Sequence, residues 1–149
     1  MEISGFQSLR NGLRDVPPRT AVVAAAHDPH TLEAVFQARR DGLIRPLLVG
    51  ERDKILRIAE ELGAPMPEED VVDARDDGEC ARRSVELIRQ GRVCPELVIG
   101  VPVGFVNVVP SKELILTLDE TPYIVARGRK GGSNIAACIC NALLYMLEA

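Results

Sequence analysis

The chain has 149 residues, of which 46% are apolar and only 3% are aromatic, and its formal net charge is −4. This length suits one ordinary domain, which can bury enough surface to fold without a disulfide or a metal. The acidic balance and the scarcity of aromatic residues argue against nucleic-acid and membrane partners, and no apolar run approaches the roughly 18 residues of a membrane span. The first residues lack the pattern of a signal peptide, so we expect a cytoplasmic protein.

The predicted elements begin with a helix and then alternate between strands and helices. Residues Ser4–Arg14 carry apolar residues at helical spacing and predict a short docking helix. The continuous small-apolar run Thr20–Ala26 predicts a buried strand. Asp28 and Pro29 are typical of an N-cap and a first helical position, and Gly42 is a suitable end for that helix.

The rest of the chain repeats this alternation. Further strands are predicted over Pro46–Val49, Val71–Ala74, Glu96–Val101 and Tyr123–Ala126. Helices are predicted around Ile55–Leu62 with Gly63 as the stop, from about Gly78 to Gly91, and over Ser111–Leu118. A last helix is predicted to begin at a Ser133 cap, and its apolar face consists of Ile135, Ile139, Leu143 and Leu147. Parallel strands joined by right-handed crossovers then give a single α/β domain over residues 1–149, a three-layer, doubly wound, five-stranded parallel sheet. Its strand order is either Rossmann-like or flavodoxin-like.

Ligands of open α/β sheets bind beyond the carboxyl ends of the strands, where helix N-termini also gather. The segment after the fifth strand reads Arg127-Gly128-Arg129-Lys130-Gly131-Gly132-Ser133 and places three cations on an acidic protein. Its glycines let the backbone approach a ligand, and Arg can bind a carboxylate or phosphate through two parallel hydrogen bonds. We therefore predict an anion site here. The alternative is a solvated loop whose glycines only turn the chain.

The segment after the fourth strand is glycine-rich but apolar. It contains Gly100 and Gly104, and Asn107 is the side chain able to recognise a ligand by hydrogen bonds. It lacks the Gly-Lys-Ser/Thr ending of a phosphate-binding P-loop. It suits a wall against a large, flat and partly apolar ligand, or else a tight strand-to-helix turn.

The two histidines, His27 and His30, flank the predicted helix start. Because Asp28 and Pro29 are explained as a cap, the histidines carry no clear role, and His27 is only a weak candidate for proton transfer. The four cysteines form no C-x-x-C pair, so no metal site is predicted and the thiols are expected to be reduced.

From about Ala81 onward the chain resembles the C-terminal half of precorrin-8X methylmutase, an isomerase family of cobalamin biosynthesis. The resemblance is carried by the stretches Leu97–Asn107, Ser111-Lys112-Glu113, Pro122-Tyr123-Ile124, Arg127–Ser133 and Asn141–Leu144. It implies proton-assisted methyl migration on a carboxylate-rich tetrapyrrole, no metal or redox cofactor, and a homodimer. The family's catalytic histidine lies in an Ile-His motif of the N-terminal half, and neither histidine of this chain follows an isoleucine. The resemblance thus implies binding of the tetrapyrrole rather than turnover.

The N-terminal residues up to about Arg75 resemble, more loosely, the phosphate acetyl/butyryltransferase family. The matching stretches are Ala21–Ala26, Leu32–Val35 and Arg45–Gly50. A join between two families is therefore expected near residues 76–92. Three readings follow: a precorrin-8X methylmutase-like domain that binds a tetrapyrrole through Arg127–Ser133, Gly100, Gly104 and Asn107; a transferase-like fragment that binds phosphate or CoA; and a fold-only chimera without a ligand.

Overall fold

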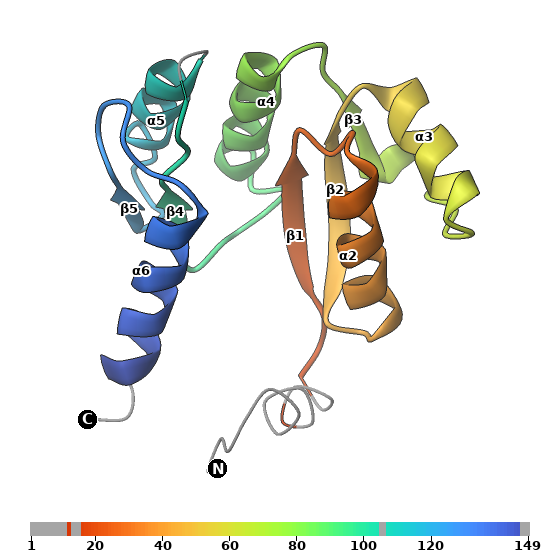
Figure 1. Cartoon of the computed structure of the whole chain (residues 1–149), viewed down its shortest axis with the longest axis horizontal. Coiled ribbons are helices and arrows are strands. Elements are labelled where there is room, and N and C mark those ends of the chain that lie inside the picture. The colour runs from red at the N-terminus through yellow and green to blue at the C-terminus, as the bar shows by residue number, and fades with distance from the viewer. Residues whose placement is uncertain (1–11, 13–15, 105–106, 147–149) are drawn as a thin grey trace. The chain divides into compact units, whose positions relative to one another are not determined.

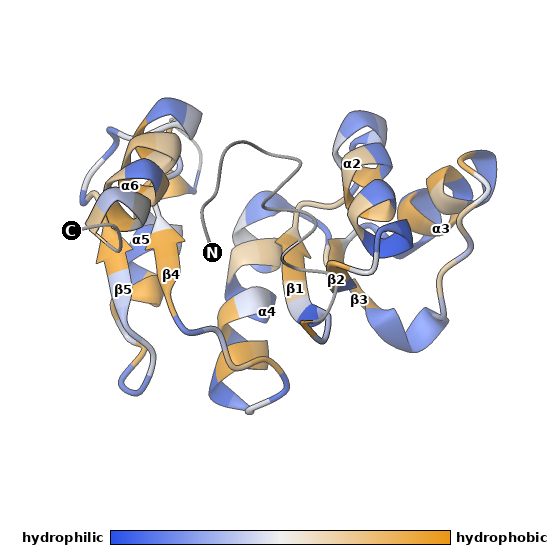
Figure 2. Cartoon of the chain, turned by 90° about the horizontal axis from the view of Figure 1, so that it is seen from below, coloured by the Kyte–Doolittle hydropathy of each residue, from blue (hydrophilic) through white to orange (hydrophobic). Residues whose placement is uncertain are grey.

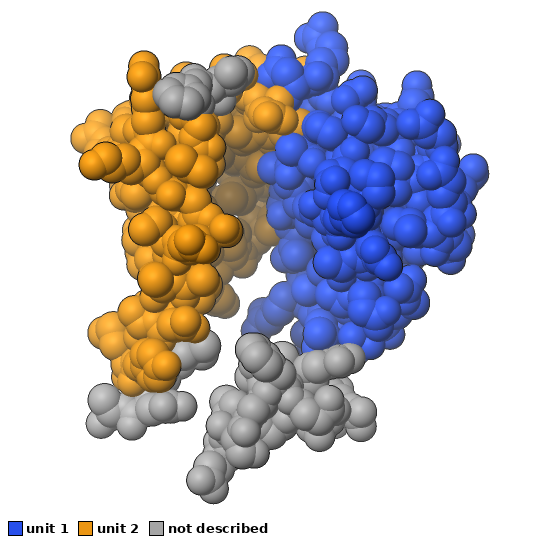
Figure 3. Space-filling view, in the orientation of Figure 1, with its two compact units in different colours: residues 1–76 blue, residues 77–149 orange. Residues whose placement is uncertain are grey.

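The computed structural model describes residues 12, 16–104 and 107–146, and its contacts divide the chain into two compact units (Figure 3). Unit 1 comprises residues 1–76 and unit 2 comprises residues 77–149. Both units combine helices with parallel strands, which confirms the predicted α/β class. The helix expected over Ser4–Arg14 lies almost wholly outside the described residues.

Unit 1 alternates strands and helices along the chain (Figure 1). Its elements are, in order, β1 (Arg19–Ala24), α2 (Pro29–Arg40), β2 (Ile44–Gly50), α3 (Arg52–Glu61), the short 3₁₀ helix η1 (Glu68–Asp70) and β3 (Val71–Asp73). β2 is the central strand and runs parallel to both β1 and β3, with Leu48 opposite Val23 on one side and Val71 on the other. The order β1-β2-β3 describes this three-stranded sheet alone, so the choice between a Rossmann-like and a flavodoxin-like order of five strands stays a prediction.

The core of unit 1 lies between its sheet and helices α2 and α3, which pack against the strands and against each other. α2 contributes Leu32 and Phe36, each no more than 1% exposed, because they recur at helical spacing on one face. The side-chain carboxylate of Asp28 accepts a hydrogen bond of 2.7 Å from the Thr31 amide at the start of α2, as predicted for an N-cap. The pKa of the Asp28 carboxyl is lowered, first by hydrogen bonding with the Thr31 side chain and next by the hydrogen bond from the Thr31 amide.

Unit 2 consists of α4 (Asp77–Arg89), β4 (Val98–Gly100), α5 (Val108–Ile115), β5 (Tyr123–Val125) and α6 (Ser133–Met146) (Figure 1). β4 and β5 are parallel, with Ile99 opposite Ile124 and Gly100 opposite Val125. Neighbouring residues of a strand point to opposite faces. A Cβ built on Gly100 would lie 2.6 Å from Ile115 of α5, whereas Ile99 lines a groove with Ala136 of α6. α5 and α6 therefore cover opposite faces of this small sheet.

Several features differ from the prediction. β1 was expected to be buried but is at most half-buried, and α5 begins at Val108 rather than at Ser111. The described strands form a three-stranded and a two-stranded sheet, so the continuous five-stranded, three-layer sheet is not confirmed. β4 is shorter than the expected Glu96–Val101, because it pairs with β5 over only three residues. Ser133 is the first residue of α6 rather than its cap, and the expected buried stripe is incomplete, since Ile135 is 43% exposed. Figure 2 shows that α6 is largely apolar nonetheless.

Candidate functional site

Two connections leave the carboxyl ends of β4 and β5 side by side. We call residues 127–133, after β5, the basic loop, and residues 101–104, after β4, the apolar loop. Gly100 and Val125 are paired at the ends of their strands, so the chain enters both loops from neighbouring positions. This is the edge of a parallel sheet at which ligands bind, and the structure brings the two predicted site segments together there.

The basic loop rests directly on the apolar loop. The Gly132 amide donates a hydrogen bond of 2.7 Å to the Val101 carbonyl. A Cβ added to Gly131 would lie 2.2 Å from the Val101 carbonyl oxygen and 2.6 Å from that of Pro102, which only glycine avoids. The contact explains why glycines occur in pairs here. It also means that the Gly132 amide already has a partner, while the amides of Gly131 and Ser133 stay candidates to bind an anion.

A shallow groove of about 350 Å³ lies beside this contact. Its lining is predominantly apolar and comes from β4, the apolar loop and the first turn of α6: Ile99, Val101, Pro102, Val103, Gly132, Ser133 and Ala136. Val103 is 61% exposed, so an apolar side chain faces solvent at the groove. The groove matches the predicted wall for a flat and partly apolar ligand.

The three cations of the basic loop differ in their partners. Arg127 forms a bidentate ion pair with Glu113 of α5, and the shortest of its N–O distances is 3.1 Å. This pairing counts against Arg127 as a ready anion ligand. However, its side chain is 71% exposed and that of Glu113 is 46% exposed. Ion pairs in such positions contribute only about 0–1 kcal/mol, so an incoming anion can displace Glu113 at little cost.

Arg129 and Lys130 are both exposed, and neither side chain forms an ion pair or hydrogen bond with any residue that the structure describes. They lie next to Gly128, whose φ of +79° is a conformation that favours glycine. Arg129 and Lys130 are therefore the cations best placed to receive a ligand carboxylate or phosphate.

Lys112 of α5 is a site residue that the sequence interpretation did not single out. Its side chain is 0% exposed, and its ammonium donates hydrogen bonds of 2.9 Å to the Gly128 carbonyl and 2.6 Å to the Lys130 carbonyl. The sequence feature that could have revealed Lys112 is its spacing. Lys112 lies four residues after Val108 and three before Ile115, and it therefore falls on the apolar face of α5. Lysine at such a position is unusual, since charged residues are rarely fully buried.

Three predicted site residues remain, at the end of β4 and between the strand and α5: Gly100, Gly104 and Asn107. Their contacts and backbone conformations explain them as parts of the fold rather than as ligand-binding residues. Gly100 leaves room for Ile115, as described above, and Gly104 has a φ of +146°. Asn107 has a left-handed backbone at the start of α5, and its carbonyl accepts hydrogen bonds from both the amide and the hydroxyl of Ser111. Its side chain makes no capping bond and does not line the groove. Phe105 and Val106 lie outside the described residues.

His27, the weak catalytic candidate, belongs to unit 1 and follows β1, whereas the basic loop belongs to unit 2. Its Nδ1 atom is buried and has no hydrogen-bond partner among the described residues. A Cβ on Gly50 would lie 3.1 Å from that atom, so the imidazole packs closely over the end of β2. Nothing in these contacts prepares His27 to transfer a proton to a ligand of the basic loop.

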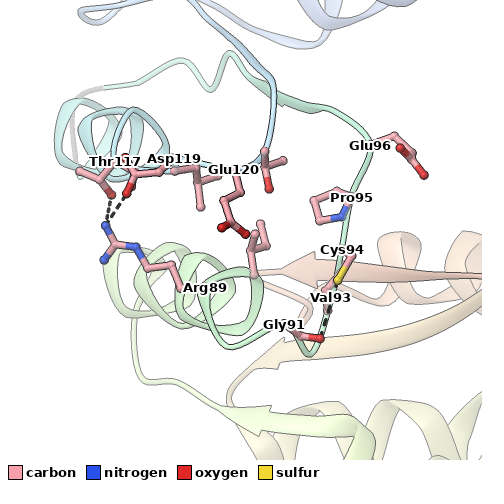
Figure 4. A pocket seen from close by; sticks show the side chains of 12 residues that line it. Arg89, Gly91, Val93, Cys94, Pro95, Glu96, Thr117, Asp119 and Glu120 are labelled. Carbon is pink, nitrogen blue, oxygen red and sulfur yellow. Dashed lines mark hydrogen bonds between the residues drawn. The ribbon is translucent and has the colours of Figure 1, made fainter.

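A larger cavity of about 480 Å³ lies beside the segments that precede β4 and β5 (Figure 4). Arg89 of α4 donates hydrogen bonds to the carbonyl and the hydroxyl of Thr117 at its edge. Its other charged lining residues are acidic: Glu96, Asp119 and Glu120. This cavity contains none of the predicted site residues, and its acidic groups would repel an anion, so it is not the candidate site.

In the described ranges there is no group of three or more His, Cys, Asp or Glu side chains that could hold a metal ion. A search of the same residues for a helix long and apolar enough to cross a membrane also found none.

Comparison with known proteins finds two families that the chain resembles. Residues 80–146 match the family model of precorrin-8X methylmutase. The cobalt-precorrin-8 methylmutase of Leptospira interrogans (serogroup Icterohaemorrhagiae, serovar Lai) is 52% identical over 66 residues, which cover 41% of this chain and 30% of that protein. The resemblance of the C-terminal half to this family is thus confirmed. A crystal structure of the precorrin-8x methyl mutase from Thermus thermophilus is 26% identical, covers 97% of this chain and 73% of its own, and has a TM-score of 0.46.

The second resemblance is also found. A phosphate butyryltransferase from Clostridium acetobutylicum is 29% identical over 127 residues, which cover 83% of this chain and 42% of the transferase. The transferase similarity therefore extends beyond the N-terminal half in which we expected it. The matched regions span less than half the length of both curated relatives.

Proposed function

We propose that unit 2 binds a carboxylate-rich tetrapyrrole, a precursor of cobalamin, at the groove beside the basic loop. One observation carries the proposal: the basic loop is docked on the apolar loop beside an apolar groove that Gly132 and Ser133 help to line. The same loop carries Arg129 and Lys130, whose side chains have no partner among the residues that the structure describes. Residues 80–146, which match the precorrin-8X methylmutase model, contain the whole of this arrangement.

The chemistry of the two surfaces fits such a ligand. A tetrapyrrole has a broad apolar ring and a rim of acetate and propionate groups, so it needs an apolar wall and adjacent cations at once. The exposed Val103 side chain and the edge of Pro102 supply apolar contact area. Arg129 supplies a planar, permanently charged group that holds a carboxylate through two hydrogen bonds, and Lys130 adds a point charge. A small anion would leave the apolar part of the site unused.

We propose binding rather than turnover. Methyl migration requires a proton-transfer group, and losing such a group typically costs about 10²–10⁴-fold in rate. Neither His27 nor His30 stands in the Ile-His motif that the resemblance implies. The surroundings of His27, described above, support the same conclusion.

The test uses uroporphyrin, a tetrapyrrole with acetate and propionate side chains, and its neutral methyl ester. We expect uroporphyrin to bind the full chain with a shift of its visible absorption band, and the ester to bind more weakly. The double variant Arg129→Ala/Lys130→Ala should lower the affinity for uroporphyrin by about thirtyfold, because two charged contacts are lost and each is worth of order 1 kcal/mol.

The matched control is Lys54→Ala/Arg57→Ala on α3. It removes the same number of positive charges from exposed, weak ion pairs of unit 1. Equal affinities of the two double variants would show that only net charge matters and would overturn the assignment to the basic loop. Absence of any uroporphyrin binding to the unchanged chain would overturn the proposed function itself.

The alternative is a phosphate- or CoA-binding fragment, which the transferase resemblance over 83% of the chain favours. In this case the same basic loop would bind phosphate, and the apolar groove would be incidental. Phosphate or CoA would then raise the melting temperature of the chain, since any ligand of the folded state stabilises it by mass action, whereas uroporphyrin would not. If neither ligand binds, the reading as a fold without a ligand stands.

Three further expectations stay proposals. A single domain with one five-stranded sheet is supported by the alternation of strands and helices in the sequence alone. A family join near residues 76–92 is supported by the division of the contacts between Asp76 and Asp77, although the long transferase match speaks against a sharp one. A homodimer is implied by the resemblance alone.

A further inference from the structure

Lys112 is the one charged or polar residue classed as buried among those that the structure describes. No carboxylate of the described residues lies within ion-pair distance of its ammonium, whose two hydrogen-bond partners are backbone carbonyls. Removing a charge from water without a counter-ion is costly. An apolar side chain of similar length would fill the same space without this cost. Packing alone therefore does not account for a lysine at this position.

The two carbonyls that Lys112 binds belong to Gly128 and Lys130, the residues on either side of Arg129. The ammonium thus fixes the backbone immediately before and after the most exposed part of the basic loop. Further anchors hold the rest of it: Glu113 pairs with Arg127, and the Gly132 amide binds the Val101 carbonyl. The backbone of the loop is thus held at several points, while the side chains of Arg129 and Lys130 have no partner within the described part of the chain.

We propose that Lys112 is a positioning residue that holds the basic loop ready for an anion. Its effect is twofold. It removes conformational freedom that the loop would otherwise lose on binding, which strengthens binding without a new contact. It also engages two carbonyl oxygens, whose partial negative charge would weaken the attraction for an anion if they faced the ligand. The anion itself rests on the proposed function, whereas the ordering of the loop does not.

The first measurement is amide hydrogen exchange along the full chain, without any ligand. Lys112→Met keeps the length of the side chain and removes its three donors. We expect exchange of the amides in residues 128–133 to accelerate by at least about tenfold, while α2, α3 and α4 keep their rates. Lys112→Arg keeps the charge and donors, so it should restore part of the protection. Lys54→Met, on an exposed position of α3, is the control and should change none of these rates.

The second measurement is the affinity for uroporphyrin, which should fall about tenfold in Lys112→Met and recover in part in Lys112→Arg. Unchanged exchange at residues 128–133 in Lys112→Met, or acceleration spread evenly over all helices, would overturn the proposal. If Lys112→Met does not fold, Lys112→Gln takes its place, because it removes the charge and reaches less far toward the two carbonyls; loop exchange at the unchanged rate in that variant would overturn the proposal equally. Should the unchanged chain bind no uroporphyrin, the proposed function fails and the exchange result still decides the role of Lys112.

Discussion

The ion pair between Arg127 and Glu113 decides how many cations the basic loop offers. Both partners are exposed, and the pair competes with any anion for the guanidinium of Arg127. Because α5 supplies Glu113 next to Lys112, the same turn of helix both orders the loop and occupies one of its charges. The loop is therefore partly self-neutralised in the absence of a ligand.

Removing this competition should strengthen anion binding. In Glu113→Gln the side chain keeps its size but loses its charge, so Arg127 is released toward the ligand. We expect the affinity for uroporphyrin to rise, by up to about fivefold, since an exposed ion pair is worth no more than about 1 kcal/mol. Absorption titration of the variant beside the unchanged chain measures this effect.

The matched control for that change is Glu61→Gln on α3, which removes an equal charge from an exposed pair with Arg57. An equal gain in both variants would mean that overall charge, and not release of Arg127, produces the effect. A loss of affinity in Glu113→Gln would show instead that Arg127 binds best when Glu113 holds it in place.

At the scale of elements, helix α2 shows how local chemistry fixes a boundary. The Asp28 carboxylate accepts a hydrogen bond from the Thr31 amide, and hydrogen bonding with the side chain and then the amide of Thr31 lowers the pKa of the carboxyl. A carboxyl with a lowered pKa stabilises the folded state above its unfolded pKa and loses this contribution as the pH falls through its folded value. The charged cap should therefore act fully at neutral pH, begin to weaken as the pH falls below the ordinary carboxyl pKa of about 4, and be lost below the lower pKa of the folded state.

This reasoning predicts a pH-dependent effect of Asp28→Asn. Asparagine is also a good N-cap, but its amide does not titrate. At pH 7 we expect the variant to be slightly less stable in urea than the unchanged chain, because a charged acceptor is lost. Below about pH 3 the difference should vanish or reverse, since the aspartate is then protonated. A constant difference between pH 7 and pH 3 would contradict the assigned cap.

Helices were predicted better than strands, for a physical reason. The ends of α2, α3 and α4 depend on nearby residues, and the predicted stops Gly42, Gly63 and Gly91 all have the positive φ of a helix end. The length of β4 and the continuity of a sheet depend on which strands pair, which no local pattern specifies. Hence the apolar run Glu96–Val101 suggested a long strand, while pairing limits it to Val98–Gly100.

The sequence predicted which segments form the candidate site but not the contacts that hold them. The basic loop and its glycines were visible in the sequence because their chemistry is local. Their partners were not, because Glu113 and Lys112 approach the loop only through the packing of α5. The position of a charged residue on an apolar helix face was the one feature of the sequence that pointed to Lys112. No feature of the sequence pointed to the close contact of Gly131 with the Val101 carbonyl.

At the scale of the whole molecule, net charge and local charge oppose each other. The chain carries a formal charge of −4 at pH 7, yet its candidate site presents the cations Arg129 and Lys130. A polyanionic ligand is repelled by the net charge at long range and attracted by the loop at short range. Salt screens the two effects unequally, because the Debye length falls from about 30 Å at 0.01 M to about 10 Å at 0.1 M and 3 Å at 1 M.

The two effects can be separated by the kinetics of uroporphyrin binding. Between 0.01 and 0.1 M salt, screening mainly removes the long-range repulsion, so we expect the association rate constant to rise by about two- to threefold. Toward 1 M salt the contacts in the bound complex are screened as well, so the dissociation rate constant should increase. Stopped-flow absorption at several salt concentrations yields both constants. The Arg129→Ala/Lys130→Ala variant should keep the rise in association and lose most of the salt dependence of dissociation. If association slows from the lowest salt upward, the basic loop must already dominate at long range, and the opposition between net and local charge would be wrong.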